Sequence, residues 1–367
     1  MQKSITFYAH RFSKLFNERG ISLINETPKN NLIPHNRLTL GTLEEKTAID
    51  VIRSGWLVQG TAVESFENEL CHYLDIPIGS AVAVSSGTAA LYLTLEAIEA
   101  KGKNIAIPFY CCPALRNATN FAGGTPVLFD SKIDSPNINT YDITQTMDIA
   151  IIPHLFGIPQ KIQKTRINSY IIEDCAQSLG AKVDEIPVGL QGDVSIFSFY
   201  ATKLITSGGQ GGMIVSKDKS LIKELKDYRT FHQKADAKNR FNFEMTDLQA
   251  AIGTAQLRQL PNFLKRRDEI YEQYLEANLP LLEQKSGITP VRYRAILQTE
   301  KQTELIEALA KDNIIATMPL HPSELFGLTD PFPNAHYWLH HTVSLPIYPS
   351  LRNEEVKRII KIAKDVL

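Results

Sequence analysis

The sequence has 367 residues, of which 43% are hydrophobic, and a formal net charge of −1. This length is enough for one large domain and a smaller one, with ample core. The near-neutral charge argues against nucleic-acid and membrane-surface partners, because proteins of both classes carry a basic excess.

Other sequence features disfavour the membrane and secreted classes. No apolar run reaches the roughly 18 residues of a membrane span, and the segment 1–7 lacks the apolar stretch of a secretory signal. The cysteines show no CxxC spacing, and no pair of histidines has the context of a metal site. We therefore expect a cytoplasmic protein with reduced thiols and no metal.

Residues 1–33 are polar and weakly patterned, and we interpret them as an N-terminal extension with room for one short helix. Apolar positions recur at helical spacing from Thr42 to Ser54, and Gly55-Trp56 then breaks the pattern. Seven short runs rich in Val, Ile and Phe follow, at 81–84, 104–107, 125–129, 148–152, 170–172, 195–199 and 212–215.

These runs are typical of strands buried on both faces of a sheet. Where helical stretches separate them, the connection is that of a parallel α/β sheet, whose ligands bind at the carboxyl ends of the strands. A helical pattern begins at Asp247, and Pro261 is expected to end or kink that helix before helical spacing resumes through Tyr271.

The C-terminal region mixes strand and helix signals without a long parallel series. A weak strand signal covers 291–297, a helix is expected at 301–311, and a terminal helix is expected from Asn353. This mixture predicts a small α+β domain. We therefore expect a large domain of residues 34–254 and a small domain of residues 255–367.

Lys203 and Asp174 each follow an apolar run, at the position where a buried strand would end. Pyridoxal phosphate (PLP) needs a lysine for its Schiff base and a carboxylate opposite its protonated ring nitrogen. The small, apolar and glycine residues around Lys203 would desolvate its amine. The alternatives, taken residue by residue, are a solvated lysine and a helix-capping aspartate.

The motif Ser85–Leu91 follows a predicted strand and opens a helix, so its amide groups and Gly87 could bind phosphate. On this motif alone, an ordinary capped turn is the favoured reading. Ser198 could hold the same phosphate or could be a core serine. The fingerprints of dinucleotide and P-loop sites, GxGxxG and GxxxxGK[ST], are absent.

Two further polar residues follow strands. Gln177 could reach the phenolate oxygen of PLP, or it could be a surface glutamine. His154 could be a core histidine with both ring nitrogens satisfied, but its position after a strand favours a place in the pocket.

Together these segments resemble the sugar-nucleotide aminotransferases of the DegT–DnrJ–StrS group, which are fold-type-I PLP enzymes. The resemblance runs from about Ile33 to the C-terminus. It rests on Arg53-Ser54-Gly55-Trp56 with Gly60, Ser86-Gly87-Thr88-Ala89-Ala90-Leu91, Pro153-His154-Leu155-Phe156-Gly157, Glu173-Asp174-Cys175-Ala176-Gln177, Phe197-Ser198-Phe199 with Lys203, Gly211-Gly212-Met213, 242–253 and 344–349.

The resemblance implies a three-layer α/β/α domain with a mostly parallel seven-stranded sheet, followed by a small α+β domain. It implies that Lys203 forms the Schiff base, that Asp174 binds the pyridine nitrogen and that Gln177 contacts the ring hydroxyl. The implied phosphate ligands are Gly87, Thr88, Ala89 and Ser198, together with Asn242 from the second subunit of a homodimer with shared sites. Trp56, His154 and His321 are candidates for contact with the substrate.

Family substrates are nucleotide-linked keto-sugars, with glutamate as the usual amino donor, so the resemblance implies an aminotransferase of amino-sugar and polysaccharide biosynthesis. Three departures stand out. Cys112 takes the place of the aromatic residue that stacks on the cofactor, and the loop after Lys203 is one residue longer, with Gln210 where glutamate is common. The first thirty or so residues have no counterpart in the family.

Two alternatives remain open. One is another reaction on the same scaffold, such as sugar dehydration, which Lys203 disfavours because family dehydratases replace that lysine. The other is a non-catalytic regulatory relic of the fold. The missing ring-stacking aromatic favours a relic, whereas the intact pair of Lys203 and Asp174 opposes it.

Overall fold

The computed structural model describes residues 31–144, 146–164, 169–232, 234–282, 286–325 and 331–367. The short helix allowed for in the N-terminal extension lies outside these residues. The extension was expected to include Ile33, but this residue belongs to the folded unit Ile33–Leu367. Its backbone pairs with Asn313 and Ile315, and its side chain is buried in a core.

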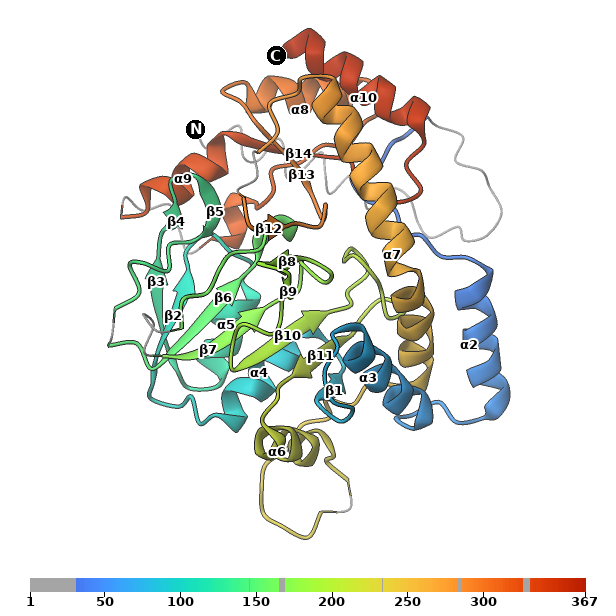
Figure 1. Ribbon diagram of the computed structural model, residues 1–367, viewed down its shortest axis with the longest axis vertical. Helices are drawn as coiled ribbons and strands as arrows, with labels where there is room; N and C mark the ends of the chain where they lie inside the picture. Colours follow the sequence, from blue (N-terminus) through green and yellow to red (C-terminus); the bar gives the residue numbers. More distant parts are fainter. Residues whose placement is uncertain (1–30, 145, 165–168, 233, 283–285, 326–330) are drawn as a thin grey trace. The chain divides into compact units, whose positions relative to one another are not determined.

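A seven-stranded sheet forms the centre of this unit (Figure 1). Its spatial order is β1-β11-β10-β7-β6-β2-β3. The strands are β1 (Ala81–Val84), β2 (Asn104–Pro108), β3 (Thr125–Phe129), β6 (Ile149–Pro153), β7 (Tyr170–Asp174), β10 (Val194–Ser198) and β11 (Gly212–Val215). All seven predicted runs are strands, with ends shifted by no more than two residues.

Strand β11 runs antiparallel to both of its neighbours, β1 and β10, whereas the other pairs are parallel. The connection from β10 to β11 contains no helix, so the chain returns directly instead of crossing over. The sheet is therefore mostly parallel, as expected.

Helices cover both faces of the sheet and make three layers (Figure 1). Helices α4 (Gly87–Ala97), α5 (Ala114–Phe121) and α6 (Lys219–Arg229) share one apolar core with side chains such as Val82 and Ile196. Helix α3 (Thr61–Tyr73) and the first half of α7 (Asp247–Glu276) share the other core with Ala83 and Phe197. Successive strand residues thus enter opposite cores, as the pleat requires.

The C-terminal region forms a separate core around the antiparallel pair β13 (Ala295–Gln298) and β14 (Thr342–Leu345). Helices α8 (Gln302–Lys311), α10 (Asn353–Val366) and the second half of α7 pack there, and α9 (Pro333–His340) packs in an adjoining core. Strand β13 begins at Ala295, so the first four residues of the predicted strand at 291–297 are not part of it.

Helix α7 does not end at Pro261. It is 30 residues long in total, and this proline lies inside it. Pro261 removes one backbone donor, yet Leu257, Leu260 and Phe263 on either side are buried in one core. Packing on both sides of the proline therefore holds the helix together. The predicted domain boundary at 254/255 falls within this helix.

The remaining elements are short or peripheral: α2 (Thr42–Ser54), β4 (Ser131–Lys132), β5 (Ser135–Ile138), η1 (Leu155–Gly157), β8 (Lys182–Val183), β9 (Ile186–Pro187), β12 (Ile288–Thr289) and η2 (Pro322–Glu324). Helix α2 matches its predicted bounds and ends at Gly55, whose φ of 73° is the left-handed cap that glycine adopts readily. Within the described part of the chain, no helix combines the length and apolarity needed to cross a bilayer.

Candidate active site

Asp174 and Lys203 are brought together at the ends of two neighbouring parallel strands. Asp174 is the last residue of β7, and its register partner on β10 is Ile196. The chain leaves β10 at Ser198 and reaches Lys203 five residues later. The two side chains are close enough for the lysine charge to lower the pKa of the Asp174 carboxyl group.

Asp174 is 7% exposed, and its Oδ1 accepts a hydrogen bond of 3.0 Å from the backbone N–H of Ala176. Burial raises the pKa of this carboxyl group, although the Ala176 N–H and the Lys203 charge oppose the shift. A buried carboxylate with so few partners is costly. A protonated ring nitrogen against Asp174 would supply the missing donor.

The loop that carries Lys203 is held by its own backbone. The Lys203 N–H donates to Tyr200 O at 2.9 Å, and the Ala201 N–H donates to Gly209 O at 3.0 Å. Gly209 has φ of 118°, a conformation that side chains disfavour. Ser207 Oγ also donates to Gln249 O at 2.7 Å, which ties the loop to α7. The lysine is therefore presented from a fixed turn.

The predicted phosphate motif lies against the end of β10. Ser86 caps α4 by accepting a 3.1 Å hydrogen bond from the Ala89 N–H. A Cβ built on Gly87 would lie 2.8 Å from Ser198 Cβ, and one on Gly212 would overlap with the Ser86 backbone. The glycines thus allow the helix N-terminus, β10 and β11 to meet closely.

The predicted phosphate ligands differ in whether their donor groups are already hydrogen-bonded. The Ala89 amide is already bonded to Ser86 Oγ, as in the capped-turn alternative. The amides of Gly87 and Thr88 lie in the first turn of α4, where no intrahelical acceptor exists. Ser198 Oγ lies beside Gly87. Gly87, Thr88 and Ser198 therefore lie together at the positive end of the helix, an arrangement that we call the anion cradle because it suits an anion.

Gln177 is oriented by the turn after β6. Its Oε1 accepts a 2.7 Å hydrogen bond from the backbone N–H of Phe156, a residue held at φ of 61°. Because the carbonyl end of the amide is engaged, its amino end is the one available to donate to a ligand oxygen. This orientation suits the predicted contact with the oxygen on the PLP ring.

His154 does not line a pocket, contrary to the expectation from sequence. Its side chain has no exposed surface. Nε2 lies 2.8 Å from Glu173 Oε1, and Nδ1 accepts a 3.1 Å hydrogen bond from the Gln160 N–H. A strand end offers both interior and pocket positions, and this ring occupies the interior. His154 is therefore not placed to contact a substrate, and this prediction is wrong.

Glu173, next to Asp174, accepts from four groups. Besides His154, the backbone N–H groups of Gly189, Gln191 and Gly192 lie 2.6–2.9 Å from its oxygens. Burial would raise the pKa of Glu173, but these hydrogen bonds outweigh it and the pKa is lowered.

The structure also places His154, Glu173 and Cys175 together, with possible ligand atoms within 4.8 Å of one another. No sequence motif pointed to this cluster. The hydrogen bonds described above already engage its imidazole and carboxylate.

Cys112, at the solvent edge, lies near both Asp174 and Lys203. The surrounding protein desolvates its thiol and raises its pKa, which the Lys203 charge opposes. Glu324 is also near enough to affect this thiol. Glu324 belongs to η2. The N-cap residue of η2, His321, is exposed and accepts a 3.2 Å hydrogen bond from the Ser323 N–H.

Trp56 and Asn242 are both exposed. Trp56 Nε1 donates to Gln59 O at 3.2 Å. Asn242 Oδ1 accepts a 3.0 Å hydrogen bond from the Glu244 N–H, a local turn of the kind considered as the alternative to phosphate binding. The neighbouring Phe243 O accepts a 2.8 Å hydrogen bond from the Ser85 N–H, beside the cradle of the same chain.

Sequence reasoning missed Tyr293. The ring centroid of this residue lies 5.4 Å from Lys203 Nζ. It comes from the region assigned to a weak strand, about ninety residues downstream of Lys203. No local motif points to it, because the contact depends on tertiary packing alone.

The sequence of this chain is similar to those of a known enzyme family. The sequence model of the DegT/DnrJ/EryC1/StrS aminotransferase family matches residues 39–364. The chain belongs to this family. It is therefore a PLP-dependent aminotransferase, as the motifs predicted.

Individual relatives agree with this assignment to sugar aminotransferases. The GDP-perosamine synthase of Escherichia coli O157:H7 is 30% identical, with 88% of this chain and 95% of that protein covered. The dTDP-4-dehydro-2,3,6-trideoxy-D-glucose 4-aminotransferase of Saccharopolyspora spinosa is 28% identical, with 87% and 93% covered. The structure of Spr1654 from Streptococcus pneumoniae in its PMP form is similar, with a TM-score of 0.82, 25% identity and coverage of 91% and 98%.

The residues of this aminotransferase fit its cofactor. The donor-rich cradle at Gly87 and Ser198 suits a phosphate, and the under-bonded Asp174 suits a protonated ring nitrogen. Lys203 follows all three in sequence and is close to Asp174 in space.

Proposed function

We propose that the enzyme transfers the amino group of glutamate to a keto-sugar carried on a nucleotide. The observation that carries the proposal is that Asp174 ends β7 while Lys203 lies in the loop after the neighbouring strand β10, whose last residue, Ser198, lies beside Gly87. The two relatives named above support a nucleotide-linked sugar, because their names contain GDP and dTDP.

Each residue of the site has a part in this reaction. When bound, PLP withdraws electrons from the α-carbon of the amino donor. Asp174 accepts the ring N–H and keeps that proton in place, while Gln177 donates to the ring oxygen. The amine of Lys203 would move the α-proton of the donor to the cofactor in the first half-reaction and a proton from the cofactor to the sugar carbon in the second, acting as base and then as acid in each.

Two measurements test this proposal. The protein with PLP should show a visible absorbance band that borohydride abolishes, and the tagged peptide should contain Lys203. Glutamate together with a panel of keto-sugar nucleotides should then yield 2-oxoglutarate and an amino sugar. A tag on another lysine would exclude the assignment of Lys203. A tag on Lys203 without any product from the panel would exclude the proposed substrate class.

We also infer a homodimer in which each subunit completes the site of the other. Exposed apolar side chains support such an interface, because a stretch of this kind is unusual on a monomer. They occur on α2 and its flanking segments and include Leu38, Leu40, Ile49, Ile52, Trp56, Leu57 and Val58. In this proposal Asn242, next to the exposed Phe241, reaches the phosphate of the partner.

Subunit exchange tests the shared site. Lys203→Ala and Asn242→Ala homodimers should each be inactive. A mixed dimer would hold one site with both defects and one site with neither, so activity should return in part. If exchange is proven and Asn242→Ala is inactive but no mixture regains activity, Asn242 acts within its own chain.

We further infer that the enzyme acts in the cytoplasm. All four cysteines are free thiols, and three of them are buried. Such thiols are typical of reducing compartments. A tagged protein recovered from a membrane or secreted fraction would contradict this inference.

A further inference from the structure

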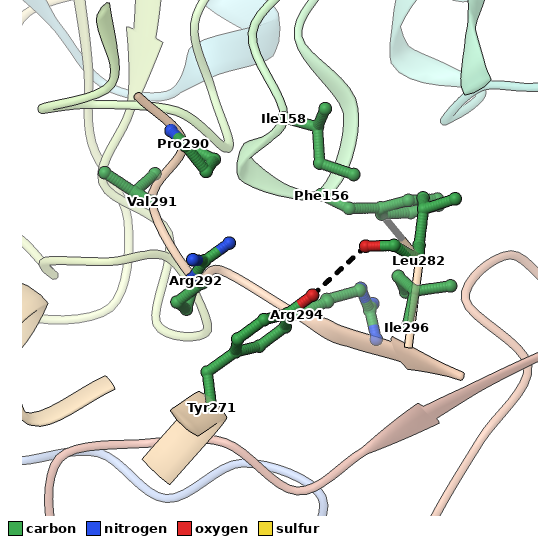
Figure 2. A pocket seen from close by; sticks show the side chains of 9 residues that line it. All are labelled: Phe156, Ile158, Tyr271, Leu282, Pro290, Val291, Arg292, Arg294 and Ile296. Carbon is green, nitrogen blue, oxygen red and sulfur yellow. Dashed lines mark hydrogen bonds between the residues drawn. The ribbon is translucent and has the colours of Figure 1, made fainter. Parts of the chain in front are cut away.

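The segment before β13 is docked onto the turn after β6. The Val291 N–H donates to Gly157 O at 2.9 Å, and the Arg294 N–H donates to Phe156 O at 3.3 Å. Gly157 has φ of 85°, and a Cβ there would overlap with the carbonyl group of Val291. Figure 2 shows Phe156, Val291 and Arg294 around one small pocket. Tyr293 lies within this docked segment, so its backbone is fixed relative to the sheet.

A buried arginine holds the same segment from the other side. Arg267, on α7, is 3% exposed. Its NH1 donates to the carbonyl oxygens of Arg292, Tyr293 and Ile347 at 3.0, 3.3 and 2.7 Å. The chain at Tyr293 is therefore held by α7 as well as by the turn after β6.

The side chain of Tyr293 is directed at Lys203. Lys203 Nζ lies 5.4 Å from the ring centroid, and Arg294 Cζ lies 5.6 Å from it. The side chain of Thr202, the residue before the lysine, is close enough to the Tyr293 hydroxyl to lower its pKa. The half-buried ring thus contacts both the lysine amine and the turn that carries it.

The electrostatics agree with this geometry. Burial would raise the pKa of Tyr293, but the charges of Lys203 and Arg294 and the nearby Thr202 side chain outweigh it, and the pKa is lowered. Arg267 acts in the same direction. The charge of Lys203 also lowers the pKa of Asp174 and of Cys112, against the effect of burial.

We propose that Tyr293 is a positioning residue for Lys203, holding its amine in the active site whenever the amine is not bonded to the cofactor. This inference rests on the proposed function. A free lysine side chain has many rotamers, whereas proton transfer requires the amine within hydrogen-bond reach of the reacting carbon. The aromatic face of Tyr293 restricts those rotamers by attracting the amine to one side of the ring.

The test compares Tyr293→Phe and Tyr293→Leu with the control Tyr271→Phe. Tyr271 lies on α7, and its hydroxyl donates to Leu282 O at 3.1 Å (Figure 2), so this control removes a buried hydroxyl of the same region. Lys203 in the apoprotein is labelled with acetic anhydride across a pH series, and its peptide is quantified by mass spectrometry. Turnover is measured on the PLP-loaded enzyme.

Loss of the aromatic face should make Lys203 in Tyr293→Leu roughly threefold more reactive, because the amine is no longer held against the ring, and a contact of this kind is worth about that factor. Tyr293→Phe should show a smaller change, and Tyr271→Phe none. We expect kcat to fall by about tenfold in Tyr293→Leu with little change in KM, because positioning acts on the chemical step.

The outcomes separate the two proposals. If borohydride fails to tag Lys203 in the wild-type protein, the proposed function fails and this inference fails with it. If Lys203 is tagged but the Tyr293 variants match Tyr271→Phe in labelling and in kcat, only the positioning role of Tyr293 is overturned. Should Tyr293→Leu not fold, the conservative Tyr293→Phe variant decides on the same two readouts.

Discussion

Glu173 and Asp174 are consecutive carboxylates at the end of one strand, yet their surroundings differ completely. Glu173 accepts hydrogen bonds from His154 and from three backbone N–H groups, and its pKa is lowered. Asp174 accepts one from Ala176, and burial raises its pKa. Because side chains alternate along a strand, the two carboxylates point to opposite faces.

The difference in hydrogen bonding indicates that Glu173 stabilises the fold, whereas Asp174 is available to bind a ligand. On the Glu173 side, every strong acceptor site is used to join β6, β7 and the turn at 189–192. On the Asp174 side, a buried carboxylate is left with capacity for one more strong donor, which is the condition that a protonated cofactor ring would meet. Mutations on the two sides should therefore have different consequences.

The largest expected effect is on catalysis, in Asp174→Ala. Turnover should fall by about a thousandfold, which corresponds to about 4 kcal/mol of barrier, because the ring nitrogen loses the group that keeps it protonated. Steady-state kinetics would measure the loss, and circular dichroism should show an unchanged fold. Near-normal turnover would remove Asp174 from this role.

Glu173→Ala should instead act on folding. Three backbone N–H groups and His154 would be left without their acceptor, and breaking a buried charged network of this kind costs about 3 kcal/mol. Urea unfolding of the apoprotein would measure this change. Glu173→Gln keeps an acceptor oxygen and should lose less. Equal stability of Glu173→Ala and wild type would show that the network is not structural.

The two carboxylates should also respond oppositely to pH. A raised pKa means that Asp174 favours folding at low pH and that this contribution is lost as the pH rises through its folded pKa. For Glu173, whose pKa is lowered, the contribution is present above the unfolded value of 4.5 and is lost as the pH falls through the folded pKa.

Apoprotein Asp174→Asn tests the first half of this contrast. It should be more stable than wild type at neutral pH, by less than the Glu173→Ala loss, and this advantage should shrink in acid. The unfolding free energy of both proteins, measured between pH 4 and 8 by urea titration, would check this. An advantage that grows in acid would reverse the sign that burial implies.

The smallest expected effect concerns Cys112, on the Asp174 side. An aromatic ring in its place should tighten PLP binding, since such contacts contribute about 0.5–1.5 kcal/mol beyond their buried area. Cys112→Phe would be compared with Cys112→Ala by fluorescence titration of the apoprotein with PLP. Unchanged or weaker binding of the Phe variant would mean that another residue already covers the ring.

The sheet could be predicted from sequence because its strands are short apolar runs bounded by turns, as in 81–84 and 212–215. The closeness of Lys203 and Asp174 was also predictable, since each follows such a run and the carboxyl ends of parallel strands meet. Their roles in catalysis stay predictions.

Pattern failed where tertiary packing decided the outcome. His154 follows a strand just as a pocket residue would, and only the position of Glu173 shows that its ring is interior. Pro261 signals a helix break, but the cores on either side of it keep α7 continuous. Tyr293 reaches Lys203 through a docked segment that carries no motif of its own.

The continuity of α7 limits how this enzyme can be divided. A helix of 30 residues is about 45 Å long, and its first half fills the core beneath the sheet while Ile270, Tyr271 and Tyr274 fill the C-terminal core. A fragment ending at residue 254 would lack Leu257, Leu260 and Phe263 and would expose the apolar surface that they cover. The two cores should consequently melt as one cooperative unit, and neither half is a module that could be excised and expressed alone.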